Sequence, residues 1–413
     1  MKRPICVDLF AGVGGLSLGF EQAGFDIACA VEVDAVHCAA HKFNFPETSV
    51  ICRGVETLSA DDIRGLGLGD AKVSVVFGGS PCQGFSLMGK RSLDDPRNAL
   101  VGHFMRLVLE LTPDYFVLEN VRGLSIGKHV NFLRELVDGF SAGGYDIVLP
   151  WKVLNASSFG VPQHRERLFI LGGRRGLPLP SYPQPLTRAS GRAERVVSGL
   201  PVGPTVSQAI GDLPDADLFP ILSETDCVET LLAPRSAYAA SLREEVTDER
   251  NFSFRRTWNP NVLTASATAK HTTRTRDRFA STKFGEVESV SRFLKLDPDG
   301  ICNTLRAGTG KDRGAFTAAR PIHPFFPRCI TVREMARLHS YPDWFRFNHT
   351  KWHGAREVGN SVPPLLGRAV AAEVAKVLGY RPVRPNRIFD PADERLLTVD
   401  TTSAENFFRA GAL

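Results

Sequence analysis

The sequence predicts an α/β fold in which a mostly parallel sheet carries an inserted, smaller and loop-rich domain. Three observations support this prediction. Short apolar runs alternate with helical stretches through residues 1–172, regular periodicity weakens after Gly172, and a helical pattern returns at Thr331. Strands separated by helices of about 10–15 residues form βαβ units, whose strands are parallel. The length of 413 residues allows roughly two to three domains.

The predicted elements follow one another in a regular order. Apolar runs predict strands, which span residues 5–7, 27–33, 73–77, 115–118, 147–154 and 168–171. Apolar residues at helical spacing predict helices, which span residues 15–23, 35–43, 97–111, 130–140 and 365–379. Parallel sheets bind ligands beyond the carboxyl ends of their strands, so the informative residues should lie just after strands.

The change in pattern also divides the chain into parts. We expect the sheet domain over residues 1–173 and again over 331–380, the insert over 174–330, and an extension without an evident role over 381–413. Residues 251–330 hold fourteen basic and six acidic side chains, a difference of +8 that exceeds the net charge of +5 of the whole chain. Such a segment suits nucleic-acid phosphates and base edges. A solvated face of a small β-rich domain explains the charge equally well.

Composition excludes several classes of protein. With 43% hydrophobic and 23% charged residues, the chain is neither disordered, collagen-like nor a coiled coil. No apolar run approaches the ~18 residues that a membrane helix requires. The eight cysteines are scattered and form no CxxC pair. We therefore expect an intracellular protein with reduced thiols and no membrane span.

A glycine-rich segment follows the first predicted strand. Residues 8–15 read DLFAGVGG, and glycines at such a position let the backbone approach a cofactor. Glu32 ends the second predicted strand, where a carboxylate can accept both hydroxyls of a ribose. The spacing fits GxGxxG poorly because Ser17 occupies the last glycine position. A plain tight turn explains the glycines about as well.

Reactive side chains follow two later strands. Residues 78–86 read GGSPCQGFS, and a thiolate of Cys82 at this edge of the sheet could attack an electrophilic carbon. A single cysteine, taken alone, is more often a small buried apolar side chain. Glu119 follows the strand YFVL, where it could share a proton with a ring nitrogen. An ordinary acid at the end of a strand is the alternative.

Two arginines precede the last predicted strand. Arg165 and Arg167 could hold an exocyclic oxygen or a phosphate, although a pair of surface cations would look the same. His37 and His41 are four residues apart but lack a third ligand, so we expect no metal site.

Together and in this order, these segments resemble the DNA (cytosine-5)-methyltransferase family of bacterial restriction-modification systems. The resemblance covers residues 4–172 and 331–378 and rests on seven blocks: DLFAGVGG, VEVD, GGSPCQGFS, ENV, QHRER, REMARLHSYPDWF and GNSVPP. It implies the Rossmann-like fold of S-adenosylmethionine-dependent methyltransferases. It also implies that residues 1–173 and 331–380 form the catalytic domain, and that the insert is a target-recognition domain.

The resemblance assigns roles to the reactive residues. Cys82 would add to carbon 6 of a flipped-out cytosine in double-stranded DNA while Glu119 contacts ring nitrogen 3 and the exocyclic amine. Arg167, supported by Arg165, would bind the exocyclic oxygen. Carbon 5 would then accept the methyl group of S-adenosylmethionine.

The resemblance also predicts binding residues. Those around S-adenosylmethionine would be Phe10, Ala11, Gly12, Gly14, Gly15, Glu32, Pro81, Leu100, Asn360 and Val362. The loop 83–98 would close over DNA, and the candidate DNA contacts are Gln83, Ser86, Lys90, Arg91 and Gln163. Since Asn360 and Val362 stand far along the chain, the C-terminal helix has to return beside the first strand.

The sequence departs from the family in three places, one of which is a tail beyond residue 380 that is longer than the family needs. Val55 stands where an aspartate usually binds adenine, which leaves Glu56 as a substitute, and His339 stands where glutamine is frequent. The family further implies a monomer in the bacterial cytoplasm, near the nucleoid, and a restriction endonuclease acting on the same site without direct contact. The recognised DNA sequence cannot be read from these residues.

Three other functions stay open at this stage. An RNA (tRNA) cytosine-5 methyltransferase would use the same chemistry on another substrate. A catalytically inactive relative would bind DNA only. A nicotinamide oxidoreductase would share the sheet but lacks a good glycine fingerprint here.

Overall fold

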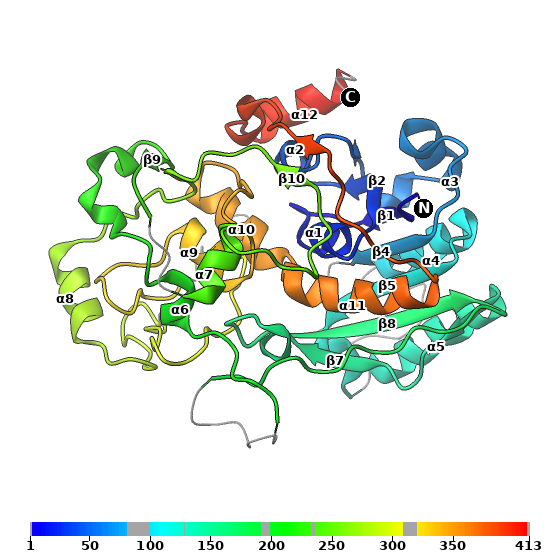
Figure 1. Cartoon of the computed structure of the whole chain (residues 1–413), viewed down its shortest axis with the longest axis horizontal. Coiled ribbons are helices and arrows are strands. Elements are labelled where there is room, and N and C mark those ends of the chain that lie inside the picture. The colour runs from blue at the N-terminus through cyan, green and yellow to red at the C-terminus, as the bar shows by residue number, and fades with distance from the viewer. Residues whose placement is uncertain are drawn as a thin grey trace.

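In the computed structural model, which describes residues 2–80, 99–127, 129–190, 199–232, 236–308 and 320–410, the chain folds around an eight-stranded sheet (Figure 1). The strand order is β3-β2-β1-β4-β5-β8-β6, and β7 pairs with β8 beside this path. Strands β1 to β5 are parallel, whereas β8 is antiparallel to β5 and to both β6 and β7. The predicted mostly parallel α/β fold is therefore confirmed.

Both faces of the sheet are covered by helices. The strands are β1 (Ile5–Leu9), β2 (Asp26–Glu32), β3 (Ser49–Cys52), β4 (Val75–Gly79), β5 (Tyr115–Val121), β6 (Tyr145–Ile147), β7 (Lys152–Asn155) and β8 (Glu166–Arg174). The covering helices are α1 (Gly15–Gln22), α2 (Ala35–Asn44), α3 (Ala60–Ile63), α4 (Ala99–Leu111), α5 (His129–Ala142) and α11 (Pro364–Val377).

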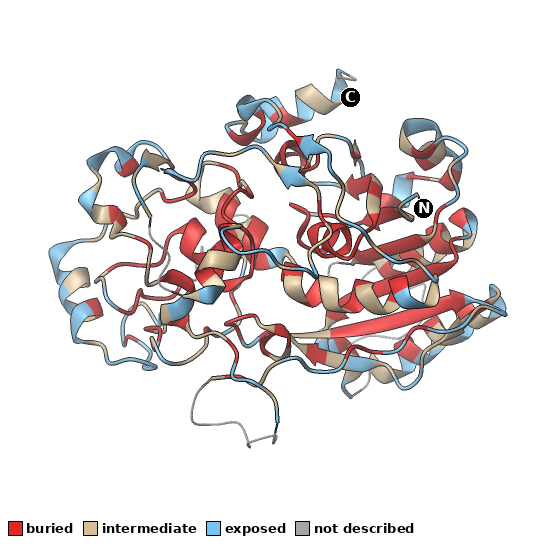
Figure 2. Cartoon of the chain, viewed as in Figure 1, coloured by how far each residue is buried: buried red, intermediate tan, exposed pale blue. Residues whose placement is uncertain are grey.

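Alternate residues of each central strand enter different cores. Cys6 and Phe77 pack in the core that includes residues of α1 and α11, whereas Val7 and Val76 pack in the core that includes residues of α4 and α5. Strands buried on both faces read as continuous apolar runs, which is why these strands were evident from the sequence. The central strands are accordingly buried along most of their length (Figure 2).

One predicted strand is two. Residues 147–154 were expected to be continuous, but β6 ends at Ile147 and β7 begins at Lys152. Pro150 lies in the break, and proline has no N–H to donate to a strand ladder. Both pieces pair with β8, so the sheet keeps its edge despite the interruption.

The remaining elements are short and lie mostly to one side of the sheet (Figure 1). They are α6 (Val206–Ile210), β9 (Val228–Glu229), α7 (Ala237–Leu242), β10 (Arg255–Arg256), β11 (Val262–Leu263), α8 (Thr273–Ser281), α9 (Val332–Leu338), α10 (Lys351–Asn360), β12 (Ile388–Phe389) and α12 (Thr401–Arg409). Their shortness agrees with the weak periodicity of the sequence. Among the described residues, no helix has the length and apolarity that crossing a bilayer demands.

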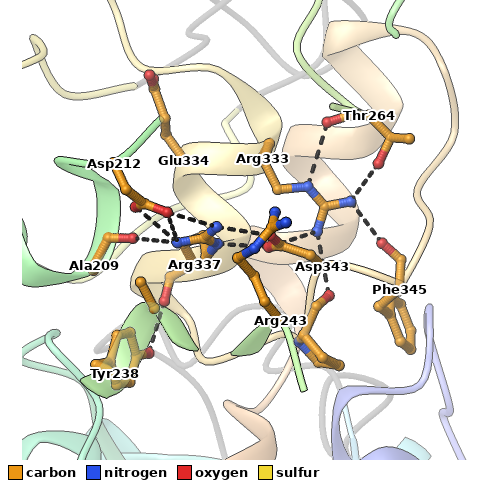
Figure 3. Close-up of polar contacts among 12 residues, drawn as sticks. Ala209, Asp212, Tyr238, Arg243, Thr264, Arg333, Glu334, Arg337, Asp343 and Phe345 are labelled. Atoms are coloured by element: carbon orange, nitrogen blue, oxygen red, sulfur yellow. Dashed lines mark hydrogen bonds and ion pairs between the residues drawn. The ribbon is translucent and has the colours of Figure 1, made fainter. Parts of the chain in front are cut away.

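Buried charges attach two segments of the insert to α9 (Figure 3). Arg337, which is fully buried, donates to both carboxylate oxygens of Asp343 at 2.5 and 2.7 Å and to Asp212 at 3.0 Å. Arg333, one turn earlier, donates to the Thr264 hydroxyl at 2.6 Å. Because Asp212 and Thr264 belong to the insert, α9 holds two of its segments at once.

The insert and the C-terminal extension also meet on the sheet domain. Arg256 of β10 makes a buried, two-pronged ion pair with Glu21 of α1 at 2.8 and 2.9 Å, and β10 pairs in parallel with β12. Further along, Ala404 of α12 packs against Ala35 and Val36 of α2. The extension, whose sequence suggested only proline and charge, therefore contains a helix that covers α2.

Candidate active site

The candidate site lies where the order of the strands reverses. After β1 the chain moves outward to β2 and β3, whereas β4 and β5 lie on the other side of β1. Loops that follow neighbouring strands therefore diverge at the carboxyl ends of β1 and β4, which is where α/β sheets bind ligands. The DLFAGVGG segment continues directly after β1, and Glu32 and the ENV block form the last residues of β2 and β5 at this edge.

The loop after β1 needs its glycines for two different reasons. Gly12 and Gly14 have φ angles of 53° and 103°, which favour glycine. A Cβ on Gly12 would meet no atom within 4 Å, so space is open beside this residue. A Cβ on Gly15 would lie 2.4 Å from the carbonyl oxygen of Val362. Gly12 thus leaves room for a ligand, and Gly15 lets the two distant ends of the chain touch.

The carboxylate of Glu32 is fixed by backbone donors. The Gly12 N–H donates to its Oε2 at 2.9 Å, and the N–H groups of Val33 and Asp34 donate to its Oε1, each at 2.9 Å. Val33 is 70% exposed although it is apolar. Val33 was not among the predicted site residues. It could have been found from its position, because it is an apolar residue directly after the carboxylate predicted to bind the ribose.

The position expected to contact adenine is unsuitable for that role. Val55 is 3% exposed and packs within the core on the α4–α5 face of the sheet. Glu56, the next residue, is exposed. The burial of Val55 agrees with its being a departure from the family at this position, and Glu56 stays the candidate substitute.

Glu119 and Arg167 form the central polar contact of the site. Arg167 Nε lies 2.8 Å from Glu119 Oε1, and both side chains are largely buried. The contact forms because β8 runs antiparallel to β5, so that Arg167 pairs with Val121, two residues beyond Glu119. Burial raises the pKa of Glu119, although Arg167 and Arg165 oppose the shift. A buried carboxyl with a raised pKa is suited to donate a proton or a hydrogen bond.

Two further residues shape this contact. A Cβ on Gly79 would lie 2.4 Å from Glu119 Oε2, so glycine at the end of β4 gives the carboxyl its place. Asn120 donates to both the carbonyl oxygen and the hydroxyl of Ser80, at 3.1 and 3.0 Å. It thereby fixes the residue that precedes the Pro-Cys-Gln segment. The sequence reasoning named the ENV block but gave Asn120 no role.

Several predicted residues lie outside the described part of the chain. These are Pro81, Cys82, Gln83, Ser86, Lys90 and Arg91, together with most of the loop 83–98. Their predicted roles stay predictions.

Gln163 does not fit its predicted role as a DNA contact. It is fully buried, and its amide donates to the Leu338 carbonyl oxygen at 3.2 Å and to His339 Nδ1 at 2.9 Å. Its Oε1 accepts the Leu305 N–H at 3.2 Å. With its amide bonded inside the protein, Gln163 has no surface to offer DNA, so this prediction is corrected.

Arg165 supports the site from behind. It is fully buried and donates to the carbonyl oxygens of Leu305, Gly359 and Ser361 at 2.9, 2.9 and 2.7 Å. A guanidinium engaged in this way cannot reach a substrate oxygen, which leaves that task to Arg167. The prediction that Arg165 acts in support fits this geometry.

His339 joins the same network. Because Nδ1 accepts from Gln163, Nε2 carries the hydrogen and donates to the Ser361 carbonyl oxygen at 3.1 Å. Burial, with Arg165 nearby, lowers the pKa of His339, so the ring is neutral. The sequence marked His339 only as a departure from the family. In the structure, its ring links the Gln163 side chain to the Ser361 backbone.

The other predicted cofactor residues are split between the two ends of the chain. Phe10 and Leu100 are half-buried and pack against the same core, and Val362 is 5% exposed. Ala11 is buried and Asn360, the last residue of α10, is exposed. The return of the C-terminal helix is confirmed, because α11 and α1 pack in one core. Within the described ranges, no group of three or more His, Cys, Asp or Glu side chains could hold a metal ion.

Comparison with known proteins gives consistent matches over nearly the whole chain. A sequence model of the C-5 cytosine-specific DNA methylase family matches residues 5–376. The type II methyltransferase M.XorII of Xanthomonas oryzae pv. oryzae is 53% identical over 409 residues, covering 99% of this chain and 93% of that protein. M.DdeI of Desulfomicrobium norvegicum, also a type II methyltransferase, is 32% identical over 394 residues, covering 89% and 88%.

One solved structure has the same fold and a comparable sequence. It is a crystal structure described as a DNA modification methyltransferase encoded within an Escherichia coli prophage, with a TM-score of 0.73 and 32% identity. The match covers 91% of this chain and 99% of that chain.

Proposed function

Because this chain belongs to the C-5 cytosine-specific DNA methylase family, we propose that it methylates carbon 5 of a cytosine flipped out of double-stranded DNA through a covalent bond to Cys82. Relatives of the type II class act in restriction-modification, which supports a short, fixed recognition sequence and a restriction endonuclease for the same site. We further propose that it acts as a monomer.

The residues at the carboxyl edge of β1 and β2 fit S-adenosylmethionine. Gly12 leaves open space, and Oε2 of Glu32, which accepts one backbone N–H, has acceptor capacity left for a ribose hydroxyl, whereas Oε1 already accepts two. The exposed apolar Val33 suits a face of the adenine ring. When bound, S-adenosylmethionine supplies an electrophilic methyl group that carbon 5 can accept.

The Glu119–Arg167 contact is the observation that carries the proposed mechanism. Carbon 6 of cytosine is a weak electrophile, and negative charge develops on the ring as the thiolate of Cys82 adds to it. A buried Glu119 with a raised pKa can donate at ring nitrogen 3, and Arg167 can bind the exocyclic oxygen. Both contacts grow stronger as the charge forms, which is how an enzyme favours a transition state.

The remaining steps return the enzyme to its starting state. Addition at carbon 6 makes carbon 5 nucleophilic. After methylation a base, such as water, removes the hydrogen from carbon 5, and the electron pair of that C–H bond re-forms the 5,6 double bond. The sulfur of Cys82 leaves from carbon 6 as a thiolate.

Covalent trapping tests this proposal directly. A duplex carrying 5-fluorocytosine at the methylated position blocks loss of the substituent at carbon 5, so the enzyme should stay bound to DNA through denaturation in the presence of S-adenosylmethionine. The site itself comes from expression in a methylation-deficient host followed by bisulfite sequencing. We expect a stable adduct that maps to Cys82.

Matched variants sharpen the result. Cys82→Ser should form no adduct, and Glu119→Gln should form it slower by roughly 10²–10⁴-fold, the range for a lost general acid. Methyl transfer to tRNA but not to duplex DNA, or an adduct at another cysteine, would overturn the proposal.

A further inference from the structure

A pair of thiols lies directly behind the carboxylate proposed to hold the ribose. Cys38 is on α2, and Cys52 is the last residue of β3. Their side chains interact directly, and Cys38 Sγ lies 3.3 Å from the carbonyl oxygen of Glu32, so the single thiol hydrogen of Cys38 is shared between the Cys52 sulfur and this oxygen. Cys52 is the ladder partner of Glu32. Both thiols therefore contact or pair with the residue that carries the carboxylate.

The two thiols have unequal reactivity. Cys38 is fully buried, and burial raises its pKa. Cys52 is only half-buried, and the hydrogen bond from Cys38 lowers its pKa even though burial and the carboxylates of Glu32, Asp34 and Glu405 oppose the shift. A partly exposed thiol with a lowered pKa next to a second thiol is the arrangement found at oxidation-sensitive cysteines.

No other cysteine in the described part of the chain has this combination. Burial raises the pKa of all the remaining ones, which are Cys6, Cys29, Cys227, Cys302 and Cys329. Cys52 also packs beside Ala404 and Phe408 of α12, so the C-terminal helix forms one wall around it. The pair thus differs from the other described cysteines because Cys52 combines a lowered pKa with partial exposure.

We propose that Cys38 and Cys52 form a reversible disulfide when a peroxide oxidises them, and that this bond weakens binding of S-adenosylmethionine. Only the effect on binding of S-adenosylmethionine rests on the proposed function; formation of the disulfide does not. The Cys52 thiolate attacks one peroxide oxygen, the O–O bond breaks, and a sulfenic acid and a hydroxide ion form; the proton that the Cys52 thiol lost converts the hydroxide to water. Cys38 then attacks that sulfur and loses its proton as a second water leaves. The two sulfurs give up two electrons, which reduce hydrogen peroxide to water.

The effect on the cofactor site follows from the contacts. Once Cys38 has lost its hydrogen, the Glu32 carbonyl oxygen loses this donor. An S–S bond of about 2.05 Å also draws α2 and the end of β3 together. The Glu32 carboxylate accepts hydrogen bonds from Val33 and Asp34, which lead into α2, so a shift of α2 displaces it.

Peptide mapping tests the bond, and calorimetry tests its effect. The full-length Cys82→Ser protein is used so that oxidation of that residue plays no part. It is treated with hydrogen peroxide, its remaining thiols are alkylated, and it is cleaved after glutamate. Residues 33–47 and 48–56 are then separate peptides with one cysteine each. We expect these two peptides to be linked, with a loss of two hydrogens.

The binding arm uses the same samples. The affinity for S-adenosylmethionine should fall by roughly tenfold or more on oxidation, as expected for displacing a charged hydrogen-bond acceptor, and return with a dithiol reductant. Cys52→Ser should abolish both the link and the response, whereas Cys227→Ser should keep both. Absence of the linked peptide while other cysteines oxidise, or a link that leaves the affinity unchanged, would overturn the inference. If the reduced protein does not bind S-adenosylmethionine, the proposed function fails, and the mapping still decides whether the disulfide forms.

Discussion

Replacing Arg337 with methionine should loosen α9 and the parts of the insert that it holds. Arg337 is fully buried and is the main partner of two carboxylates, Asp212 and Asp343, which are themselves buried. Although burial by itself lowers it, Asp343 and Asp212 raise the pKa of Arg337, so the charge is firmly retained. Methionine fills a similar volume but leaves both carboxylates without this charge.

The expected loss of stability depends on which ion-pair partners the two carboxylates keep in Arg337→Met. Removing one partner of a buried ion pair costs about 3–5 kcal/mol. Asp343 keeps Arg243 at 3.6 Å and Arg333 at 3.9 Å, which places the expected loss near the lower end of that range. A loss of about 3 kcal/mol corresponds to a change of roughly a hundredfold in an opening equilibrium.

Native-state hydrogen exchange measures this opening. Amides of α6 and α9 should exchange roughly a hundredfold faster in Arg337→Met than in the wild type. The control is Arg409→Met, because Arg409 pairs with Glu405 on the surface and its loss should cost less than about 1 kcal/mol. If exchange in α6 and α9 changed no more in Arg337→Met than in the control, the charge network would not anchor the insert.

Four further predictions concern two glycines, Glu32 and His41. Gly15→Ala should lower the free energy of unfolding by about 1–3 kcal/mol in urea titrations, since its Cβ would lie 2.4 Å from the Val362 carbonyl oxygen. Gly102→Ala, in a helix with open space around it, should instead stabilise the protein by roughly 0.5–1 kcal/mol. Glu32→Gln should weaken binding of S-adenosylmethionine by roughly 10–100-fold in calorimetry and lower the free energy of unfolding by about 1–3 kcal/mol, because both carboxylate oxygens accept backbone N–H groups and the amide keeps only one acceptor oxygen. Burial lowers the pKa of His41 from 6.5 to about 4, so the unfolded state binds the proton first and stability should fall as the pH drops from 6.5 towards 4. In His41→Asn, the urea midpoint should decrease less than in the wild type over this pH range. If the variant and the wild type showed the same dependence of the urea midpoint on pH, His41 would not be the source of the loss.

The sequence was sufficient for features that are encoded locally. Apolar runs located the central strands, and the polar residues that follow them fell at one edge of the sheet, as the topology requires. The sequence could predict that Glu119 and Arg167 lie close together, but not how their side chains contact each other. Its geometry depends on β8 being antiparallel to β5, a pairing that no local pattern in either strand specifies.

Long-range hydrogen bonds were beyond the reach of sequence patterns. The acceptors of Arg165 lie 140 to 196 residues away along the chain, and Gln163 reaches His339 across 176 residues. Nothing in the QHRER block distinguishes an inward-facing amide from one that faces a ligand. Asn120 was missed for a related reason, because its partner Ser80 belongs to a different strand connection.

The ion pair between Arg256 and Glu21 has a mechanical consequence. Together with the α9 network, it pins the insert at two separate points of the molecule. A hinge-like swing would have to expose charged groups that now lie in the interior, at a cost of several kcal/mol. Movement of the insert against the sheet is therefore confined to short segments that rearrange locally while these two sets of buried ion pairs stay in place.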